Sequence, residues 1–191
     1  MTTAVLFVAA LSVSSPAFQQ NGSIPPEFTC DGAGRNPALE IGGVPAGAKS
    51  LALIVFDPDV PKAIKSDGRY LHWALWNLEP TSAVIGESRG GGLSEGGRSG
   101  WVPPCPPNGE HRYVFQAFAL DASLGDTKVA SEDDLRRAMQ GHVLDQAELV
   151  GRYTGRVPSM VGTILLGLVL LVAVIILYRI IRRGRAAAPA A

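Results

Sequence analysis

The feature that most constrains this chain is an uncharged stretch near its C-terminal end. From Val157 to Tyr178 no residue is charged, and Leu, Ile, Val and Gly predominate. As a helix this stretch would be about 33 Å long, against roughly 30 Å for the hydrocarbon core of a bilayer. A buried core helix is the alternative, but it would normally show a polar face. The sequence therefore predicts one transmembrane helix within residues 155–178, followed by a tail over residues 179–191.

Arginines flank the predicted helix unequally. Arg152 and Arg156 precede it, whereas four arginines follow Tyr178 within a few residues. Because cytoplasmic segments beside membrane helices are enriched in Lys and Arg, we expect the tail in the cytoplasm and the domain outside it. The chain is then a single-pass membrane protein.

The first ten residues are apolar and allow two interpretations. Ala4–Val13 has the length of a signal-peptide core, but no Lys or Arg precedes it and no good A-x-A site follows. Leu11 to Ser15 alternates apolar and polar side chains, which favours a first β-strand. We assign residues 11–154 to one folded domain and residues 1–10 to an edge strand or an uncleaved signal.

The composition of the domain excludes one class of partner. Residues 1–156 hold 13 basic and 17 acidic side chains, a difference of −4. A nucleic-acid-binding domain needs a clustered basic surface, so no nucleic-acid partner is expected. The 22 glycines and 14 prolines fit a turn-rich globular fold.

Several segments have the patterns of β-strands. A continuous apolar run predicts a buried strand, and alternating segments predict half-buried ones. In the second strand, Tyr70, His72, Ala74 and Trp76 should share a face, opposite Leu71, Trp73 and Leu75. The strands expected are Ser50–Asp57, Tyr70–Leu78, Arg112–Leu120 and a short last one at Ala147–Gly151, with an irregular glycine-rich loop at Gly90–Gly100.

One soluble helix is predicted, over Ser131–Gln140. Ser131 can cap it, Leu135 and Met139 lie one turn apart on its core face, and Gly141 suits a left-handed end. Strands with long connections and a single late helix indicate a mainly β fold, an antiparallel β-sandwich with peripheral helices.

Polar side chains concentrate at three places along these strands. Asp57 and Asp59 follow a buried strand, and His72, His111 and Tyr113 lie within later ones. Strand alternation lets His111 and Tyr113 share a face, and Arg112 should point away from them. Imidazole and phenol groups could donate hydrogen bonds to an anion, while the carboxylates would orient the imidazoles.

Other interpretations of these residues stay open. Two histidines and two aspartates could bind zinc or iron, but no H-x-H or H-x-x-x-H spacing fixes the ligands. A hydrolase would need an activated nucleophile, and no G-x-S-x-G motif occurs. Each residue could also be an ordinary turn or core residue. We predict no metal, no cofactor and no catalytic residue.

The two cysteines, Cys30 and Cys105, belong to no C-x-x-C pair. In an oxidising compartment they could form a disulfide; otherwise they are two free thiols.

Five separated segments resemble, in order, the phosphatidylethanolamine-binding protein family. The similarity is greatest to its prokaryotic Raf kinase inhibitor-like branch and covers roughly residues 11–154. The segments are Phe28–Gly32, Ser50–Pro61 with its Asp-Pro-Asp-Val-Pro end, His72-Trp73, Cys105–Phe115 with its His-Arg-Tyr, and Gly141–Gly151.

The resemblance implies a β-sandwich with a pocket for phosphate-like groups and no established catalysis. By position the pocket residues would be Asp57, Asp59, His72, His111 and Tyr113. The backbone of Cys105, Pro106 and Pro107 would form a wall. It also implies binding or inhibition of kinases or proteases in some members.

Three residues depart from the pattern of this branch. Phe56 stands where another Asp is usual, Pro103 replaces a Gly, and Trp101 stands where a Tyr is usual. We expect Phe56 to remove a charge near the pocket and Pro103 to alter the approach of its backbone to an anion.

The leading hypothesis is a membrane-anchored protein that binds a phosphate-bearing or other small anionic ligand, such as a phospholipid head-group. The alternative is an interaction or inhibitor module for a kinase or protease, in which the pocket is vestigial. A hydrolase is a third and weaker hypothesis.

Overall fold

A computed structural model describes residues 10–81 and 83–155 of the 191-residue chain. The predicted membrane span, Val157–Tyr178, the tail and nearly all of the N-terminal segment lie outside these residues. Among the residues described, no helix is both long and apolar enough to cross a bilayer.

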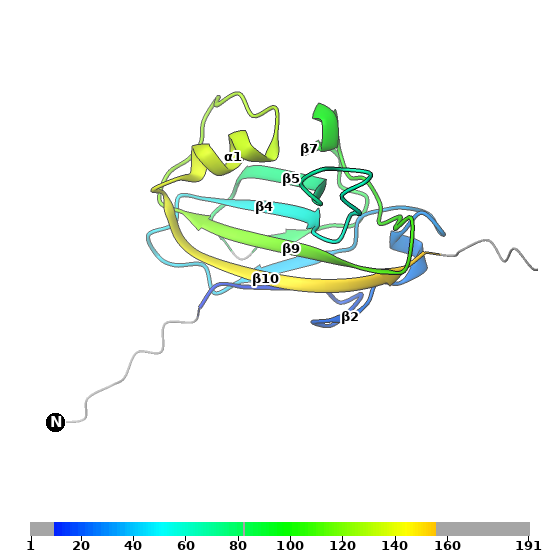
Figure 1. Cartoon of the computed structure of the whole chain (residues 1–191). Coiled ribbons are helices and arrows are strands. Elements are labelled where there is room, and N and C mark those ends of the chain that lie inside the picture. Colours follow the sequence, from blue (N-terminus) through cyan, green and yellow to red (C-terminus); the bar gives the residue numbers. More distant parts are fainter. Residues whose placement is uncertain (1–9, 82, 156–191) are drawn as a thin grey trace, which may run out of the picture. The chain divides into compact units, whose positions relative to one another are not determined.

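Seven strands form the larger sheet, in the order β2-β10-β9-β4-β5-β7-β8 (Figure 1). Neighbours run antiparallel except β10 and β2, which are parallel. Its long strands are β4 (Ser50–Asp57), β5 (Tyr70–Leu78), β9 (Glu110–Leu120) and β10 (Val143–Thr154), and its short edge strands are β2 (Gly22–Ser23), β7 (Leu93–Ser94) and β8 (Arg98–Ser99).

A smaller sheet has the order β1-β3-β6 and is antiparallel. Its strands are β1 (Ser12–Ser14), β3 (Leu39–Gly42) and β6 (Ala83–Ile85). The helices are the 3-10 turns η1 (Pro26–Phe28) and η2 (Glu95–Gly97) and the α-helix α1 (Glu132–Met139).

Two apolar cores lie on the two faces of the larger sheet. One contains Ile41 of the smaller sheet together with Leu53 of β4; the other contains Ile54 of β4 with Leu135 and Met139 of α1. The fold is therefore mainly β, a two-sheet sandwich with peripheral helices, as predicted. Because β4 faces both cores, all its residues are buried, which explains its uninterrupted apolar sequence.

The predicted helix is confirmed. The Ser131 hydroxyl accepts a hydrogen bond from the backbone N–H of Asp134 at 3.1 Å. Leu135 and Met139 are buried, and Gly141 has a φ of 82°, the left-handed conformation expected just beyond a helix end.

Two predicted segments differ from the structure. The last strand is not short: β10 starts at Val143, since it pairs with β9 along its whole length. The segment Gly90–Gly100 is not wholly irregular, because β7 and β8 add to the sheet edge there. Gly92 explains part of its glycine content, since a Cβ at that position would lie 2.5 Å from the Ala74 carbonyl oxygen.

Candidate ligand-binding pocket

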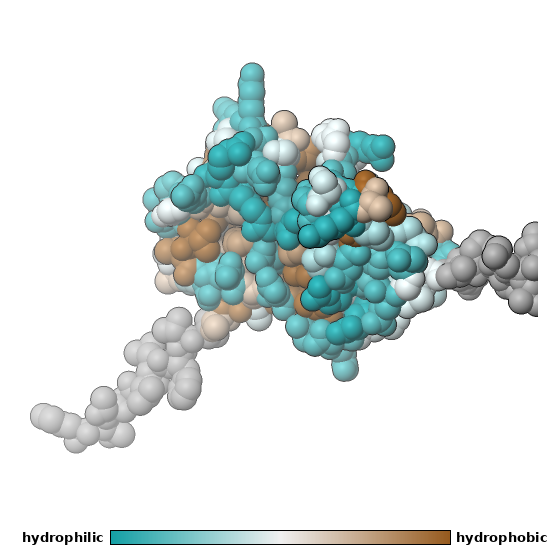
Figure 2. All heavy atoms as spheres, viewed as in Figure 1, coloured by the Kyte–Doolittle hydropathy of each residue, from teal (hydrophilic) through white to brown (hydrophobic). Residues whose placement is uncertain are grey.

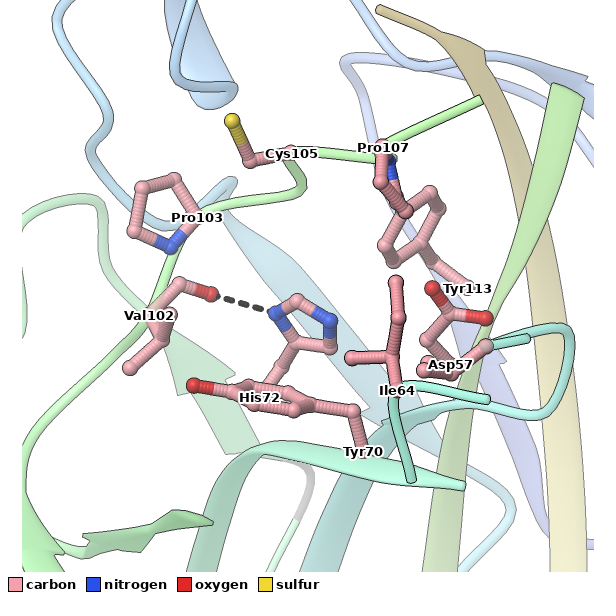
Figure 3. A pocket seen from close by; sticks show the side chains of 10 residues that line it. Asp57, Ile64, Tyr70, His72, Val102, Pro103, Cys105, Pro107 and Tyr113 are labelled. Carbon is pink, nitrogen blue, oxygen red and sulfur yellow. Dashed lines mark hydrogen bonds between the residues drawn. The ribbon is translucent and has the colours of Figure 1, made fainter. Parts of the chain in front are cut away.

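A cavity of about 290 Å³ opens at the end of the larger sheet where β4 stops and β5 begins (Figure 3). Its lining is mostly apolar, with a small number of polar groups. The lining residues are Asp57, Val60, Ile64, Tyr70, His72, Val102, Pro103, Cys105, Pro107 and Tyr113.

A β-bulge turns His72 toward this cavity. Val55 of β4 pairs with Trp73 and the next residue, Phe56, pairs with Leu71, which leaves His72 as the extra residue. Two neighbouring side chains therefore turn to the same side of the sheet, toward Tyr113 and the core between the sheets. The predicted alternation is wrong beyond this point, because His72 shares its side with Trp73.

One ring nitrogen of His72 is hydrogen-bonded to the backbone. Its Nδ1 lies 2.7 Å from the Val102 carbonyl oxygen (Figure 3). A carbonyl only accepts, so Nδ1 carries a proton. Burial lowers the pKa of His72, although the Val102 carbonyl and the Asp57 charge oppose that shift. In the neutral ring Nε2 is then an acceptor, and Figure 3 shows it directed to the side of the cavity where Asp57 lies.

Asp57 is held by two hydrogen bonds. One of its carboxylate oxygens accepts from His111 Nδ1 at 2.7 Å, and the other accepts from the backbone N–H of Asp59, also at 2.7 Å. The Asp57 and His111 side chains are each only 4% exposed. His111 is not among the lining residues, so it orients Asp57 from behind.

Tyr113 supplies a hydrogen-bond donor. Its side chain is buried, and its hydroxyl has no hydrogen-bond partner among residues 10–81 and 83–155. Burial, reinforced by the negative charge of Asp57, raises the pKa of this phenol, which keeps it protonated. The ring packs edge-on against His72, with the ring centres 5.2 Å apart.

Asp59 does not join this group. Its carboxylate forms an ion pair with Arg112, with Nη2 and Oδ1 2.7 Å apart, and also accepts from the Arg112 backbone N–H. These bonds lower the pKa of Asp59. Arg112 lies off the pocket as predicted, and Asp59 is drawn to it instead of orienting a histidine.

The predicted wall is present in part. Cys105 and Pro107 line the cavity, whereas Pro106 does not. Cys105 forms a disulfide with Cys30, whose Cα lies 5.4 Å away, and the Cys30 N–H donates to the Pro104 carbonyl at 3.0 Å. The disulfide joins the wall to the loop after η1.

Apolar lining residues were missed by the sequence analysis. Val60 and Ile64 lie in the turn after β4, and Val102 and Pro103 precede the Cys105 wall. Tyr70 was placed on a strand but not in the site. Each lies within a few residues of a residue predicted for the site: Val60 and Ile64 follow Asp59, Tyr70 precedes His72, and Val102 and Pro103 precede Cys105.

The three departures from the family pattern have different consequences. Phe56 faces the other core, with the Arg69 guanidinium carbon 3.2 Å from its ring centre, so it removes no charge from the pocket. Pro103 does line the cavity. Trp101 packs beside His72, with the ring centres 6.2 Å apart.

The polar side-chain groups of the lining residues are the hydroxyls of Tyr70 and Tyr113, which can donate, and two kinds of acceptor, His72 Nε2 and the Asp57 carboxylate. The lining contains no Lys or Arg. In the described part of the chain, no three His, Cys, Asp or Glu side chains gather as metal ligands would.

The family model described as phosphatidylethanolamine-binding protein matches residues 14–154. The chain belongs to this family. Curated members include the UPF0098 proteins of Chlamydia trachomatis, 42% identical over 147 residues, and of Methanothermobacter thermautotrophicus, 40% identical over 153 residues. Each match covers 75% of this chain and 98% of the relative.

Solved structures of family members have the same fold. A crystal structure from Chlamydia trachomatis, titled as the phosphatidylethanolamine-binding protein homolog CT736, is 40% identical with a TM-score of 0.74. It is matched over 78% of this chain and 99% of its own. Escherichia coli YbcL, at 24% identity and a TM-score of 0.66, is similar in fold; the match covers 78% of this chain and 100% of that one.

Proposed function

We propose that this protein is a membrane-anchored binding protein for a phosphate-bearing or other small anionic ligand, such as a phospholipid head-group. Membership of the phosphatidylethanolamine-binding protein family supports a ligand-binding role. The anchor is the apolar segment Val157–Tyr178, with the domain outside the cytoplasm and the basic tail inside it.

The main observation in support of an anionic ligand is the Tyr113 hydroxyl, which has no hydrogen-bond partner among the described residues. A buried hydroxyl without a hydrogen bond costs free energy, so a ligand oxygen that accepts from it removes that cost. The neighbouring His72 Nε2 accepts a proton when an anion arrives and then becomes a second donor. The Asp57 carboxylate stabilises the resulting imidazolium.

The walls of the pocket select the rest of the ligand. Apolar side chains such as Val60, Ile64 and Pro103 surround the polar groups of the pocket. The lining contains no Lys or Arg that could neutralise the two charges of free phosphate. A head-group phosphodiester, which carries one charge and has carbon on both sides, suits this lining better than inorganic phosphate.

We propose binding without turnover. The lining includes no serine, threonine or free thiol, since Cys105 is in a disulfide. Its carboxylate, Asp57, is held by hydrogen bonds from His111 and from the Asp59 N–H. A kinase or protease partner stays a prediction.

Titration calorimetry of the full chain in maltoside micelles with glycerophosphoethanolamine tests the ligand. The variant Tyr113→Phe removes only the hydroxyl, and we expect it to weaken binding roughly ten- to 100-fold, the usual range for a hydrogen bond to a charged group. Tyr153→Phe is the matched control, because the Tyr153 hydroxyl on the adjacent strand donates to Asp31 and lies outside the lining. Equal affinity of the Tyr113→Phe variant and the unmodified chain would refute this assignment.

A further inference from the structure

The chain leaves the folded domain at the same end of the sheet as the pocket. In the register of β9 and β10, Tyr153 pairs with His111 and Thr154 with Glu110. His111 in turn holds Asp57 of the pocket. Figure 1 likewise shows the turn after β4 and the last residues of β10 at one end of the sheet, with α1 toward the other.

The last described residue touches the pocket wall. A Cβ at Gly155 would lie 2.9 Å from the Pro106 carbonyl oxygen and 3.4 Å from its ring. Pro106 stands between two lining residues, Cys105 and Pro107. The exit point of the chain and the wall of the pocket are therefore in contact.

Little chain remains between this contact and the apolar segment. Only Arg156 separates Gly155 from Val157. Two residue steps span at most about 7 Å when fully extended. If Val157 begins a membrane span, as proposed, the span starts within two residues of the contact with Pro106.

An exposed apolar side chain stands at the mouth of the pocket. Ile64 lines the pocket and yet is 65% exposed. Its turn is fixed by N–H groups of Ile64 and Lys65 that both donate to the Pro61 carbonyl, at 2.8 and 3.1 Å. Lys62 beside it is exposed. Figure 2 shows a face that is mostly hydrophilic, with several apolar patches. Val84, Val143 and Leu144 are the other large apolar side chains exposed in the described part of the chain, and none of the three lines the pocket.

The opposite end of the sheet offers a comparison. Leu144, near the start of β10, is 45% exposed and lies ten residues before Thr154, or about 33 Å along the strand. The N-terminal side of the domain is also at that end, since the Leu11 N–H donates to Asp145 at 2.9 Å.

We propose that the mouth of the pocket faces the lipid surface, with Ile64 and Pro107 at the interface, and that the ligand is a head-group of the surrounding lipids. This inference rests on the proposed anchor and the proposed head-group ligand. It adds the orientation of the domain and the source of the ligand.

Depth measurements on the full chain in vesicles test the orientation. The vesicles contain equal parts of phosphatidylcholine and phosphatidylethanolamine. The variants Ile64→Cys and Leu144→Cys are purified without reductant, so that Cys30 and Cys105 stay paired, and the new thiol receives a nitroxide. We expect the label at position 64 to collide several-fold less with a water-soluble nickel complex, and more with oxygen, than the label at position 144.

Equal accessibility of the two labels, or deeper burial of the one at 144, would overturn the orientation. Flotation of the vesicles separates this failure from that of the anchor: a chain that does not float refutes both the anchor and the inference. The ligand source is tested by calorimetry with glycerophosphoethanolamine. The apparent dissociation constant should be several-fold higher in these vesicles than in maltoside micelles, because lipid occupies the pocket. Identical constants would refute a lipid source. The proposed ligand would still be supported in that case, because its test is binding in micelles.

Discussion

His72 determines how the pocket responds to pH. Its Nδ1 is bonded to Val102, and its ring is almost fully buried. The groups that act on its charge are Asp57 of β4, His111 of β9 and Glu95 of η2, while Tyr113 packs against it as a neutral phenol. Burial outweighs the two carboxylates and lowers the pKa of His72. The His72 imidazole is therefore protonated at a lower pH in the folded domain than in the unfolded chain, where a histidine takes up its proton near pH 6.5.

A lowered histidine pKa makes the domain less stable in acid. As pH falls below about 6.5 the unfolded state binds more protons, so the free energy of unfolding decreases by up to about 1.4 kcal/mol per pH unit for one such group. We expect His72→Gln, which retains a donor for Val102, to reduce the loss of stability between pH 7 and pH 5 in urea denaturation. His142→Gln is the control, because His142 is half-exposed and bonded to Asp121. An unchanged pH dependence in His72→Gln would contradict this account.

Among the elements, α1 depends on its N-cap. The Ser131 hydroxyl accepts the Asp134 N–H and donates to the Asp134 carboxylate. The variant Ser131→Ala should lower the free energy of unfolding by about 1 kcal/mol, as expected for loss of an N-cap. Ser66→Ala, at an exposed turn position, should change it little. Thermal and urea unfolding of the two variants measure the difference, and equal stabilities would show that the cap contributes nothing.

The elements that could be predicted are those with local causes. The cap at Ser131, the spacing of Leu135 and Met139, and the apolar run of β4 are all visible in the sequence. The bulge at His72 could not be predicted, because it exists only in the register of β5 against β4. The first half of β10 was missed because its side chains are largely exposed and show no apolar alternation.

The candidate site was predicted in composition better than in arrangement. Asp57, His72 and Tyr113 line one cavity, as the sequence suggested. The other two predicted polar residues, His111 and Asp59, do not line the cavity. His111 is hydrogen-bonded to Asp57, and Asp59 forms an ion pair with Arg112. Such pairings depend on distances across strands that sequence spacing does not contain.

At the scale of the whole molecule, the disulfide is the strongest long-range constraint on the unfolded chain. Cys30 and Cys105 are 75 residues apart in sequence. By the chain-entropy estimate, closing a loop of this length stabilises the fold by about 3–5 kcal/mol. We expect the double variant Cys30→Ser, Cys105→Ser to lose a comparable amount in urea denaturation. The unmodified chain should lose the same amount when reductant is added, and no further loss should occur in the variant. A double variant as stable as the disulfide-bonded chain would contradict the estimate.

The long pairing of β10 with β9 has a mechanical consequence. If the chain is anchored beyond residue 155, as proposed, a force on the domain is resisted at Thr154, the last residue of β10. Because β10 runs antiparallel to β9 from Val143 to Thr154, a pull along this strand from the α1 end of the sheet loads the hydrogen bonds of the ladder together in shear. A pull across the strand would instead open them one after another, beginning with the pairs nearest the pocket.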